Sequence, residues 1–339
     1  LCPSLRAVET LNVAVIGAGS WGTTVAALAS VNTPTTLWAR RTELADEIRV
    51  RHVNPTYLDG FELPPELDAT SSLPDAVSAA DVVVMAVPSH GYRDVVAEAA
   101  EHIRPWVPVV TLAKGLERDT QLRMSQVTAQ EIPDHPIAVL TGPNLAKEIL
   151  SGQPAASVIA VDDSLVARTL QRVFTRPHLR MYTNPDVVGC EVAGVVKNVI
   201  AIAAGMAEGM GFGDNSRATL ITRGLAEMTR LGEAMGGDPA TFAGLAGMGD
   251  LIATCSSVQS RNNMVGRRLG EGETIGGIVE SMNMVAEGVK SCPSVLELAI
   301  RHGVEMPITE QVVAVCHGQA SARDALGALM GRDSKSEVA

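Results

Sequence analysis

Residues 12–22 read Asn12-Val-Ala-Val-Ile-Gly17-Ala-Gly19-Ser20-Trp21-Gly22, an apolar run that ends in the pattern Gly-x-Gly-x-x-Gly. An Ala-rich stretch follows over residues 23–30, so a strand, a tight turn and a helix are expected in succession. Gly17 permits the turn, Gly19 lets the backbone approach a pyrophosphate, and Gly22 lets strand and helix pack closely. The N–H groups and dipole at the helix N-terminus favour phosphates. We therefore predict a dinucleotide-binding turn, with an ordinary structural turn as the alternative.

The residues after the next β-rich run, Thr35–Trp38, bear on which dinucleotide binds. A site selective for NAD usually has Asp or Glu at the end of this second strand, whereas Arg accommodates the 2′-phosphate of NADP. Arg40 and Arg41 stand there, and Glu43 already lies in the next helical stretch. The pair favours NADP(H), and leaves open the use of NAD(H) as well. The alternative is a solvated arginine pair that starts a helix.

The 339 residues change pattern part-way along the chain, and a chain of this length is expected to form two domains. Short β-rich runs alternate with helical stretches in the first half, which is typical of a mainly parallel sheet. These runs cover residues 11–16, 35–38, 81–86, 107–112, 137–140, 157–161 and 179–182. From about Val187 onward the spacing is helical, with helices expected over 186–208, 216–235, 261–271, 291–302 and 309–317. We predict a Rossmann-like, doubly wound α/β domain over 1–188, an all-α domain over 189–332 and a polar tail over 333–339.

Composition excludes several classes of protein. Lys and Arg total 27 against 38 Asp and Glu, a net charge of −11, which disfavours a nucleic acid or an anionic membrane surface as the main partner. The longest apolar run, Val192 to Ala207, is interrupted by Lys197, so we expect no membrane span. Residues 1–10 lack the pattern of a secretory signal. The five cysteines (2, 190, 255, 292 and 316) form no CxxC pair and the seven histidines no HxxxH pair, which indicates a reducing cytoplasm and no structural metal.

Lysine is rare in this chain, at positions 114, 147, 197, 290 and 335 only. Lys114 follows a β-rich run, at the sheet edge where open α/β sheets bind ligands. Lys197 lies beside Asn198 in a long apolar helix, where loss of water favours the neutral amine and makes proton exchange possible. The alternative for both is a lysine that snorkels or forms a salt bridge.

Two further segments have the character of site loops. Asp250 stands on a glycine-flanked turn in Ala246-Gly-Met-Gly-Asp-Leu-Ile-Ala-Thr254, where it could instead cap a helix. Ser260, Arg261 and Asn262 open another helix and offer a cation, an amide and backbone N–H groups to an anion. This arrangement favours a phosphate clamp, and a solvated helix start is the alternative.

Taken together, these segments resemble the bacterial NAD(P)-dependent glycerol-3-phosphate dehydrogenases. The matching stretches are GAGSWGT (17–23), LAKGLE (112–117), TGPNLAKEI (141–149), VKNVIAIAAGM (196–206), GMGDLIATC (247–255), SRNNMVGRRLG (260–270) and MVAEGV (284–289). The resemblance implies a Rossmann domain followed by a helical domain, as in 6-phosphogluconate dehydrogenase. It also implies a cytoplasmic homodimer that reduces dihydroxyacetone phosphate to sn-glycerol 3-phosphate for phospholipid synthesis.

The resemblance also assigns roles to single residues. Lys197 is the general acid–base and Asp250 lies beside it. Cofactor contacts fall at Gly17, Gly19, Ser20, Trp21, Gly22, Arg40, Arg41, Lys114, Ala146, Arg261, Val285 and Glu287. Substrate contacts fall at Lys114, Gly142, Asn144, Lys197, Asp250, Ser260, Arg261 and Asn262. Asn144 departs from the pattern, since many relatives have Ser or Thr there, which puts that contact in doubt.

Other assignments remain as alternatives. 6-Phosphogluconate dehydrogenase and UDP-glucose dehydrogenase share the two-domain plan, but the latter needs a nucleophilic Cys in a glycine-rich loop. Cys255 follows GMGDLIAT instead, which favours a small buried thiol. A dinucleotide sensor without catalysis would explain the glycine turn, yet leave Lys114, Lys197 and Asp250 without a role.

Overall fold

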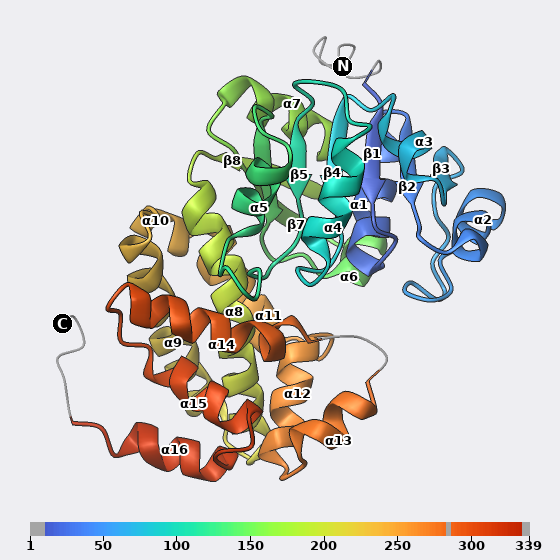
Figure 1. Ribbon diagram of the computed structural model, residues 1–339. Helices are drawn as coiled ribbons and strands as arrows, with labels where there is room; N and C mark the ends of the chain where they lie inside the picture. Colours follow the sequence, from blue (N-terminus) through green and yellow to red (C-terminus); the bar gives the residue numbers. More distant parts are fainter. Residues whose placement is uncertain (1–10, 283–285, 334–339) are drawn as a thin grey trace. The chain divides into compact units, whose positions relative to one another are not determined.

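The computed structural model describes residues 11–282 and 286–333 (Figure 1). The chain forms two compact units, one that ends at Glu191 and one that begins at Val192, so the division falls inside helix α8 (Val187–Gly209). The first unit contains a sheet with helices around it. In the second unit the described residues form helices and turns.

The sheet of the first unit has eight strands in the order β3-β2-β1-β4-β5-β6-β7-β8. The strands are β1 (Val13–Ile16), β2 (Thr35–Trp38), β3 (Leu67–Thr70), β4 (Val82–Met85), β5 (Val109–Thr111), β6 (Ile137–Thr141), β7 (Ala155–Ala160) and β8 (Leu179–Asn184). Neighbours run parallel except β6 and β7, which are antiparallel. The first six positions have the order of dinucleotide-binding folds, with the switch of direction between β1 and β4. The predicted mainly parallel α/β sheet is confirmed, and β3 is a strand that the sequence pattern did not predict.

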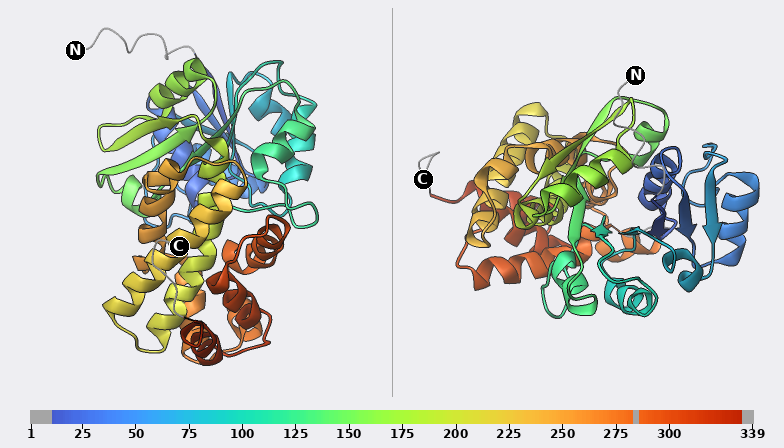
Figure 2. Two further views of the ribbon diagram at one scale, coloured as in Figure 1. Left: turned by 90° about the vertical axis from the view of Figure 1, so that its left-hand side faces the viewer. Right: turned by 90° about the horizontal axis from the view of Figure 1, so that it is seen from above.

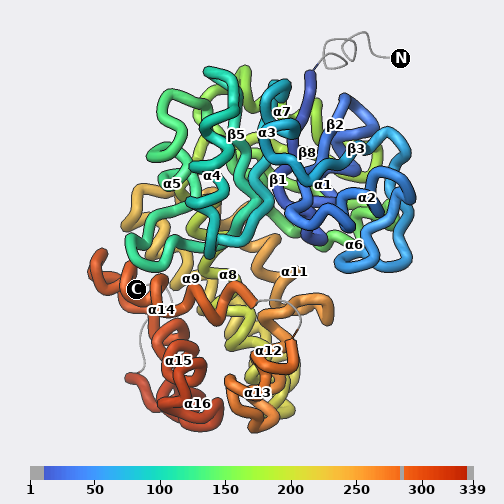
Figure 3. Tube along the Cα trace, turned by 45° about the vertical axis from the view of Figure 1, so that its right-hand side comes forward, coloured from blue at the N-terminus to red at the C-terminus, as the bar shows by residue number. Residues whose placement is uncertain are grey.

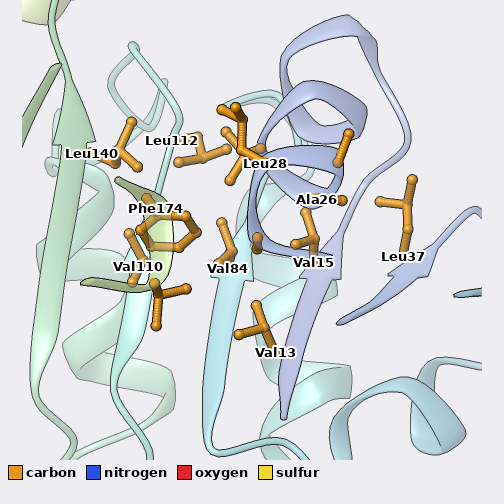
Figure 4. Packing of buried hydrophobic residues seen from close by; sticks show 14 of the residues in the cluster. Val13, Val15, Ala26, Leu28, Leu37, Val84, Val110, Leu112, Leu140 and Phe174 are labelled. Atoms are coloured by element: carbon orange, nitrogen blue, oxygen red, sulfur yellow. The ribbon is translucent and has the colours of Figure 1, made fainter. Parts of the chain in front are cut away.

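Strand β1 shows why the sheet is covered on both faces. All four of its residues, Val-Ala-Val-Ile, are buried. Val13 and Val15 pack in one apolar layer, whereas Ala14 and Ile16 pack in the other. Because successive side chains alternate between faces, a strand buried on both reads as a continuous apolar run. Figure 4 shows Val15, Val84 and Phe174 among the packed side chains of the first layer.

Two sets of helices supply these layers, so the unit is doubly wound, as predicted (Figure 2). The first set comprises α1 (Ser20–Ser30), α2 (Thr42–Arg51), α6 (Ala146–Leu150) and α7 (Ser164–Phe174). The second comprises α3 (Leu73–Val77), α4 (Tyr92–Ala100) and α5 (Met124–Glu131). Each fully buried Val or Leu in these layers stabilises the fold by about 1.5–3 kcal/mol.

The second unit is helical throughout its described part, as predicted. After α8 come α9 (Asp214–Ala234), α10 (Pro239–Phe242), the π-helical turn η2 (Leu245–Gly249), α11 (Asp250–Ser256), α12 (Arg261–Gly270), α13 (Ile275–Glu280), α14 (Glu287–Arg301), α15 (Pro307–Cys316) and α16 (Ala322–Met330). Figure 3 shows α14, α15 and α16 packed as successive neighbours. The short helices α10, α13 and α16 were not predicted, because four to nine residues give little periodicity to detect.

Helices α8 and α12 pack with their backbones in contact. Gly205 of α8 lies against the carbonyl of Asn263, and Gly266 of α12 lies against the carbonyl of Ile202. A Cβ at either glycine would overlap those backbone atoms. Glycine at both positions therefore fixes how closely the start of α12 approaches the helix that carries Lys197.

Helix α8 is long and apolar enough to cross a membrane by length and composition. Lys197 therefore lowers the hydropathy of this run too little to exclude a span by length and composition alone. In the structure, 89% of the most apolar window of α8 is buried inside the protein. Such burial is typical of the core helix of a globular domain.

Candidate active site

The glycine turn connects β1 to α1. Gly17 has φ +116°, and its N–H donates to the carbonyl of Trp38 at 3.0 Å. A Cβ at Gly17 would lie 2.7 Å from the carbonyl oxygen of Ala86, and one at Gly22 would overlap the carbonyl of Gly17. A Cβ at Gly19, in contrast, would have no neighbour within 4 Å. The first and third glycines thus permit close packing, and the second borders open space.

This open space fits a phosphate-bearing group. Gly19 is the N-cap of α1, and no side chain caps the helix. The indole Nε1 of Trp21 is buried and has no hydrogen-bond partner among the described residues. A buried N–H without a partner costs free energy, which a ligand acceptor would recover. Helix N-termini favour anions, so the turn fits the pyrophosphate of a dinucleotide.

The two arginines follow β2 at the same edge of the sheet. The hydrogen bond from Gly17 to Trp38 places the end of β2 beside the glycine turn. Arg40 and Arg41 are both exposed. The Nη2 of Arg41 donates to the Oγ1 of Thr56 at 3.2 Å, which directs its guanidinium.

Lys114 is held at the ends of two parallel neighbours, β5 and β6. Its Nζ donates to the carbonyl of Gly142 at 3.0 Å, and Gly142 has φ +120°. A buried chain of hydroxyl groups supports the loop. Ala113 N–H donates to Thr111 Oγ1 at 3.2 Å, Thr111 hydrogen-bonds the hydroxyl of Tyr92, and that hydroxyl lies 3.0 Å from Thr128 Oγ1. Burial raises the pKa of Tyr92 to about 12, so its hydroxyl stays protonated.

Two buried polar atoms near Gly142 have no hydrogen-bond partner among the described residues: the Nδ2 of Asn144 and the Oγ1 of Thr141. The Oδ1 of Asn144 accepts a hydrogen bond from Ser157. Ala146 begins α6, one turn after Gly142. Buried polar atoms of this kind point to a polar ligand. The sequence singled out Asn144 but not Thr141, whose only signal is a polar side chain at the end of a buried strand.

The second unit contains a buried cluster around Lys197. Its Nζ donates to Asp250 Oδ1 at 2.5 Å and to Thr254 Oγ1 at 2.7 Å. The side chains of Lys197 and Asp250 are 8% and 2% exposed. The Thr254 hydroxyl donates to the carbonyl of Asp250 at 2.7 Å, which leaves its lone pairs for the ammonium. A buried ion pair needs such further hydrogen bonds to offset its desolvation.

Thr254 is a polar residue of this cluster that the sequence did not single out. It follows Asp250 by one helical turn on α11, and residues four apart share one face of a helix. That spacing was the available signal.

The start of α12 is braced by amide and hydroxyl side chains. Asn262 Nδ2 donates to Asn198 Oδ1 at 3.0 Å, and Asn262 Oδ1 accepts from Gly288 N–H at 2.9 Å. Ser260 is the N-cap, and its hydroxyl accepts from Asn263 N–H at 3.2 Å. These bonds tie α12 to α8 and α14 and fix the backbone on either side of Arg261.

Arg261 is the cation at this helix start. It is exposed to solvent, and partial desolvation lowers the pKa of its guanidinium while the charge of Glu287 raises it. Glu287 is the first residue of α14. Val285, the other residue predicted at this end of the site, lies outside the described residues.

Residues 12–167 match the family described as NAD-dependent glycerol-3-phosphate dehydrogenase N-terminus, and residues 186–327 match its C-terminus. The chain belongs to the NAD-dependent glycerol-3-phosphate dehydrogenase family. The family resemblance read from the motifs is thereby confirmed.

Relatives within the family are similar along almost their whole length. The chain is 56% identical to glycerol-3-phosphate dehydrogenase [NAD(P)+] 2 of Sphingopyxis alaskensis over 320 residues, which cover 94% of this chain and 96% of the relative. It is 52% identical to the glycerol-3-phosphate dehydrogenase [NAD(P)+] of Thermobifida fusca over 330 residues, which cover 96% and 98%.

The fold is similar to that of solved structures from the same family and from another family of reductases. The glycerol-3-phosphate dehydrogenase of Coxiella burnetii matches with a TM-score of 0.91 at 35% identity, over 95% of this chain and 99% of that one. A ketopantoate reductase from Ralstonia eutropha matches over 93% of this chain with a TM-score of 0.57 at 15% identity, a likeness of fold alone.

Within this glycerol-3-phosphate dehydrogenase family member, the surroundings of Cys255 disfavour a nucleophilic thiolate. It adjoins Thr254 and is buried, and desolvation raises the pKa of its thiol to about 12. Because the thiolate is the nucleophilic form, Cys255 remains an inert buried thiol. This argues against the chemistry of UDP-glucose dehydrogenase, as the sequence pattern indicated.

Proposed function

We propose that this chain catalyses the reversible reduction of dihydroxyacetone phosphate to sn-glycerol 3-phosphate by a reduced nicotinamide dinucleotide. The observation that carries the proposal is the buried cluster of Lys197, Asp250 and Thr254 in a chain of this family. A buried amine held by a carboxylate and a hydroxyl is suited to proton transfer. Relatives at 50–56% identity are named glycerol-3-phosphate dehydrogenase [NAD(P)+].

The first unit would hold the cofactor, which supplies the hydride when bound. Its pyrophosphate would lie on the turn and the start of α1, against Gly17, Gly19, Ser20, Trp21 and Gly22. Arg40 and Arg41 would take the adenosine end, and Thr56 directs Arg41. This arginine pair favours NADP(H) as the cofactor, with NAD(H) as the alternative. Lys114, Ala146, Arg261, Val285 and Glu287 complete the proposed cofactor contacts.

Lys197 would supply the proton. As the carbonyl group is reduced, negative charge grows on its oxygen, and the ammonium of Lys197 donates first a hydrogen bond and then a proton. Asp250 and Thr254 accept hydrogen bonds from the ammonium group and thereby orient it. In the reverse reaction the neutral amine removes the hydroxyl proton. A positioned acid–base of this kind is worth about 10²–10⁴ in rate.

The phosphate of the substrate would lie at the start of α12. Arg261 gives a cation there, and Ser260 and Asn262 fix the backbone beside it. Charge-assisted hydrogen bonds from arginine to phosphate are shorter and stronger than neutral ones. Lys114, Gly142 and Asn144 are the proposed substrate contacts of the first unit.

We further propose that the enzyme works as a homodimer in the cytoplasm and supplies glycerol 3-phosphate for phospholipid synthesis. The family resemblance supports the dimer and the role in lipid synthesis. The net charge of −11 and the four buried cysteines without a disulfide among the described residues agree with a reducing compartment and a small-molecule substrate.

The test is the loss of absorbance of reduced nicotinamide when purified protein meets dihydroxyacetone phosphate. NADPH and NADH are compared in parallel, and dihydroxyacetone without phosphate is the control. We expect rapid oxidation with the phosphorylated ketone alone. Folded protein that binds NADPH but shows no oxidation would contradict the proposal and favour a dinucleotide sensor.

A further inference from the structure

The segment between α2 and β3 contains a fully buried amide, Asn54. Its Nδ2 donates to the carbonyl of Ala18 at 3.0 Å and to Thr23 Oγ1 at 2.8 Å. Its Oδ1 accepts from the N–H of Tyr57 at 3.2 Å. Ala18 lies between the first two glycines of the turn, and Thr23 lies in the first turn of α1. One side chain thus connects the glycine turn, helix α1 and a segment more than thirty residues away.

The bond to Ala18 determines the direction of another group. In a trans peptide the C=O and the following N–H point in opposite directions. Because the carbonyl of Ala18 is held toward Asn54, the N–H of Gly19 points away from it. Gly19 borders open space at the start of α1. Asn54 therefore fixes the direction of a backbone donor in the turn proposed to hold the pyrophosphate.

The same segment contacts the adenosine end. Thr56 Oγ1 accepts from Arg41 Nη2 at 3.2 Å. The segment itself is anchored, since Leu58 is fully buried and its N–H donates to the carbonyl of Asn54 at 2.9 Å. Two residues of one anchored turn thus support two different parts of the cofactor site.

We propose that Asn54 and Thr56 are positioning residues with separable effects on the cofactor. Asn54 orients the Gly19 N–H toward the pyrophosphate, which NADH and NADPH share. Thr56 orients Arg41 toward the 2′-phosphate, which only NADPH has. The proposal rests on the cofactor assignment of the proposed function.

The test measures dissociation constants for NADPH and NADH by fluorescence titration, together with melting temperatures. Asn54→Ala should weaken both cofactors by a similar factor of about ten, the loss expected when a buried hydrogen-bond donor is removed. Thr56→Val should weaken NADPH by about two- to fivefold and leave NADH unchanged, since only one exposed hydrogen bond to a cation is lost. For Thr56→Val, the ratio of the NADPH and NADH affinities is a readout that a general loss of stability does not move.

The matched control is Thr35→Val. Thr35 is a buried residue at the start of β2, the end of the strand opposite to Arg40 and Arg41. Its hydroxyl donates to the carbonyl of Thr33 at 2.9 Å. This variant should lower the melting temperature and leave both affinities unchanged. If Asn54→Ala does not fold, Thr23→Val removes one of the two hydrogen bonds that the Nδ2 of Asn54 donates, and it should weaken both cofactors by a smaller common factor.

Unchanged affinities in folded Asn54→Ala would overturn the role of Asn54. Equal weakening of NADH and NADPH in Thr56→Val would overturn the separation of effects. The titrations need no turnover, so the outcome is independent of the assigned substrate. A chain that binds both cofactors with these effects but does not reduce dihydroxyacetone phosphate would refute the proposed function alone.

Discussion

Arg261 is an exposed cation between two residues whose side chains fix the backbone at the start of α12. Its guanidinium is partly desolvated and faces the charge of Glu287. A cation held in this way can bind a phosphate without a large loss of side-chain freedom. The side chain itself contributes little to the core, so it can be removed without a cavity.

Arg261→Ala should therefore act on substrate binding. A charge-assisted hydrogen bond contributes about 1.5–3 kcal/mol, so the KM for dihydroxyacetone phosphate should rise about 10- to 100-fold. The kcat should change much less. Steady-state kinetics at saturating NADPH measure both constants. Arg267→Ala, an exposed arginine in the last turn of α12, is the control and should leave KM unchanged. An unchanged KM in Arg261→Ala would remove Arg261 from the phosphate site.

At the scale of the element, α8 and α12 depend on glycine at their contact. Gly266→Ala places a methyl group against the carbonyl of Ile202, a backbone atom that cannot rotate away. Overpacking of this kind costs about 1–3 kcal/mol, so the free energy of unfolding should fall by about that amount. Urea denaturation measures the change.

Gly327→Ala on α16 is the matched control for this substitution. A Cβ at Gly327 would have no neighbour within 4 Å. Replacement of an exposed helical glycine by alanine should raise the free energy of unfolding by about 0.5–1 kcal/mol. Opposite signs for the two variants are expected. Equal effects would show that the helices can separate without cost.

Helix α15 begins beside a buried carboxyl group on α9. Glu227 accepts from Ile308 N–H at 2.6 Å and from Thr309 N–H at 3.2 Å. Burial raises the pKa of Glu227 from its ordinary value of 4.5 to about 7, while these hydrogen bonds lower it in part. The folded protein therefore retains a proton that the unfolded chain has lost between about pH 4.5 and pH 7.

The sign of the pH dependence follows. Where the folded state binds more protons, stability falls as pH rises, so the contribution of Glu227 should be full below about pH 4.5 and lost above about pH 7. The loss is about 3 kcal/mol at most. Denaturation at several pH values, compared between the native chain and Glu227→Gln, isolates the contribution of Glu227 to the pH dependence of stability. Glu310→Gln, an exposed carboxyl of α15, is the control. An identical pH dependence in Glu227→Gln would contradict the assignment.

At the scale of the molecule, the α/β first half and helical second half were predictable because burial leaves a local pattern. Strands β1 and β4 are continuous apolar runs, and α8 is a long apolar helix. Strand β3 was missed because Leu-Asp-Ala-Thr is short and includes the exposed Asp68. The reversed direction of β7 was also not predictable, since the short connection through α6 determines it.

Some residues of the candidate site could be predicted from a local sequence pattern, and others could not. The glycine turn has a local signature, and Lys197 stands out in a chain with few lysines. Asn54 and Glu227 have no such signal, because each is explained by partners far along the chain. An isolated polar residue in a helix or loop has the same appearance in sequence whether it is solvated or buried against that partner.

In the proposed reaction the first unit binds the cofactor, and Lys197 of the second unit transfers the proton. Lys197→Arg tests it most directly, because arginine keeps the charge but does not exchange its proton. NADPH affinity by fluorescence titration and turnover of dihydroxyacetone phosphate are measured on the same folded protein. We expect unchanged NADPH affinity and a loss of turnover of about 10²-fold or more. Near-native turnover in folded Lys197→Arg would contradict it.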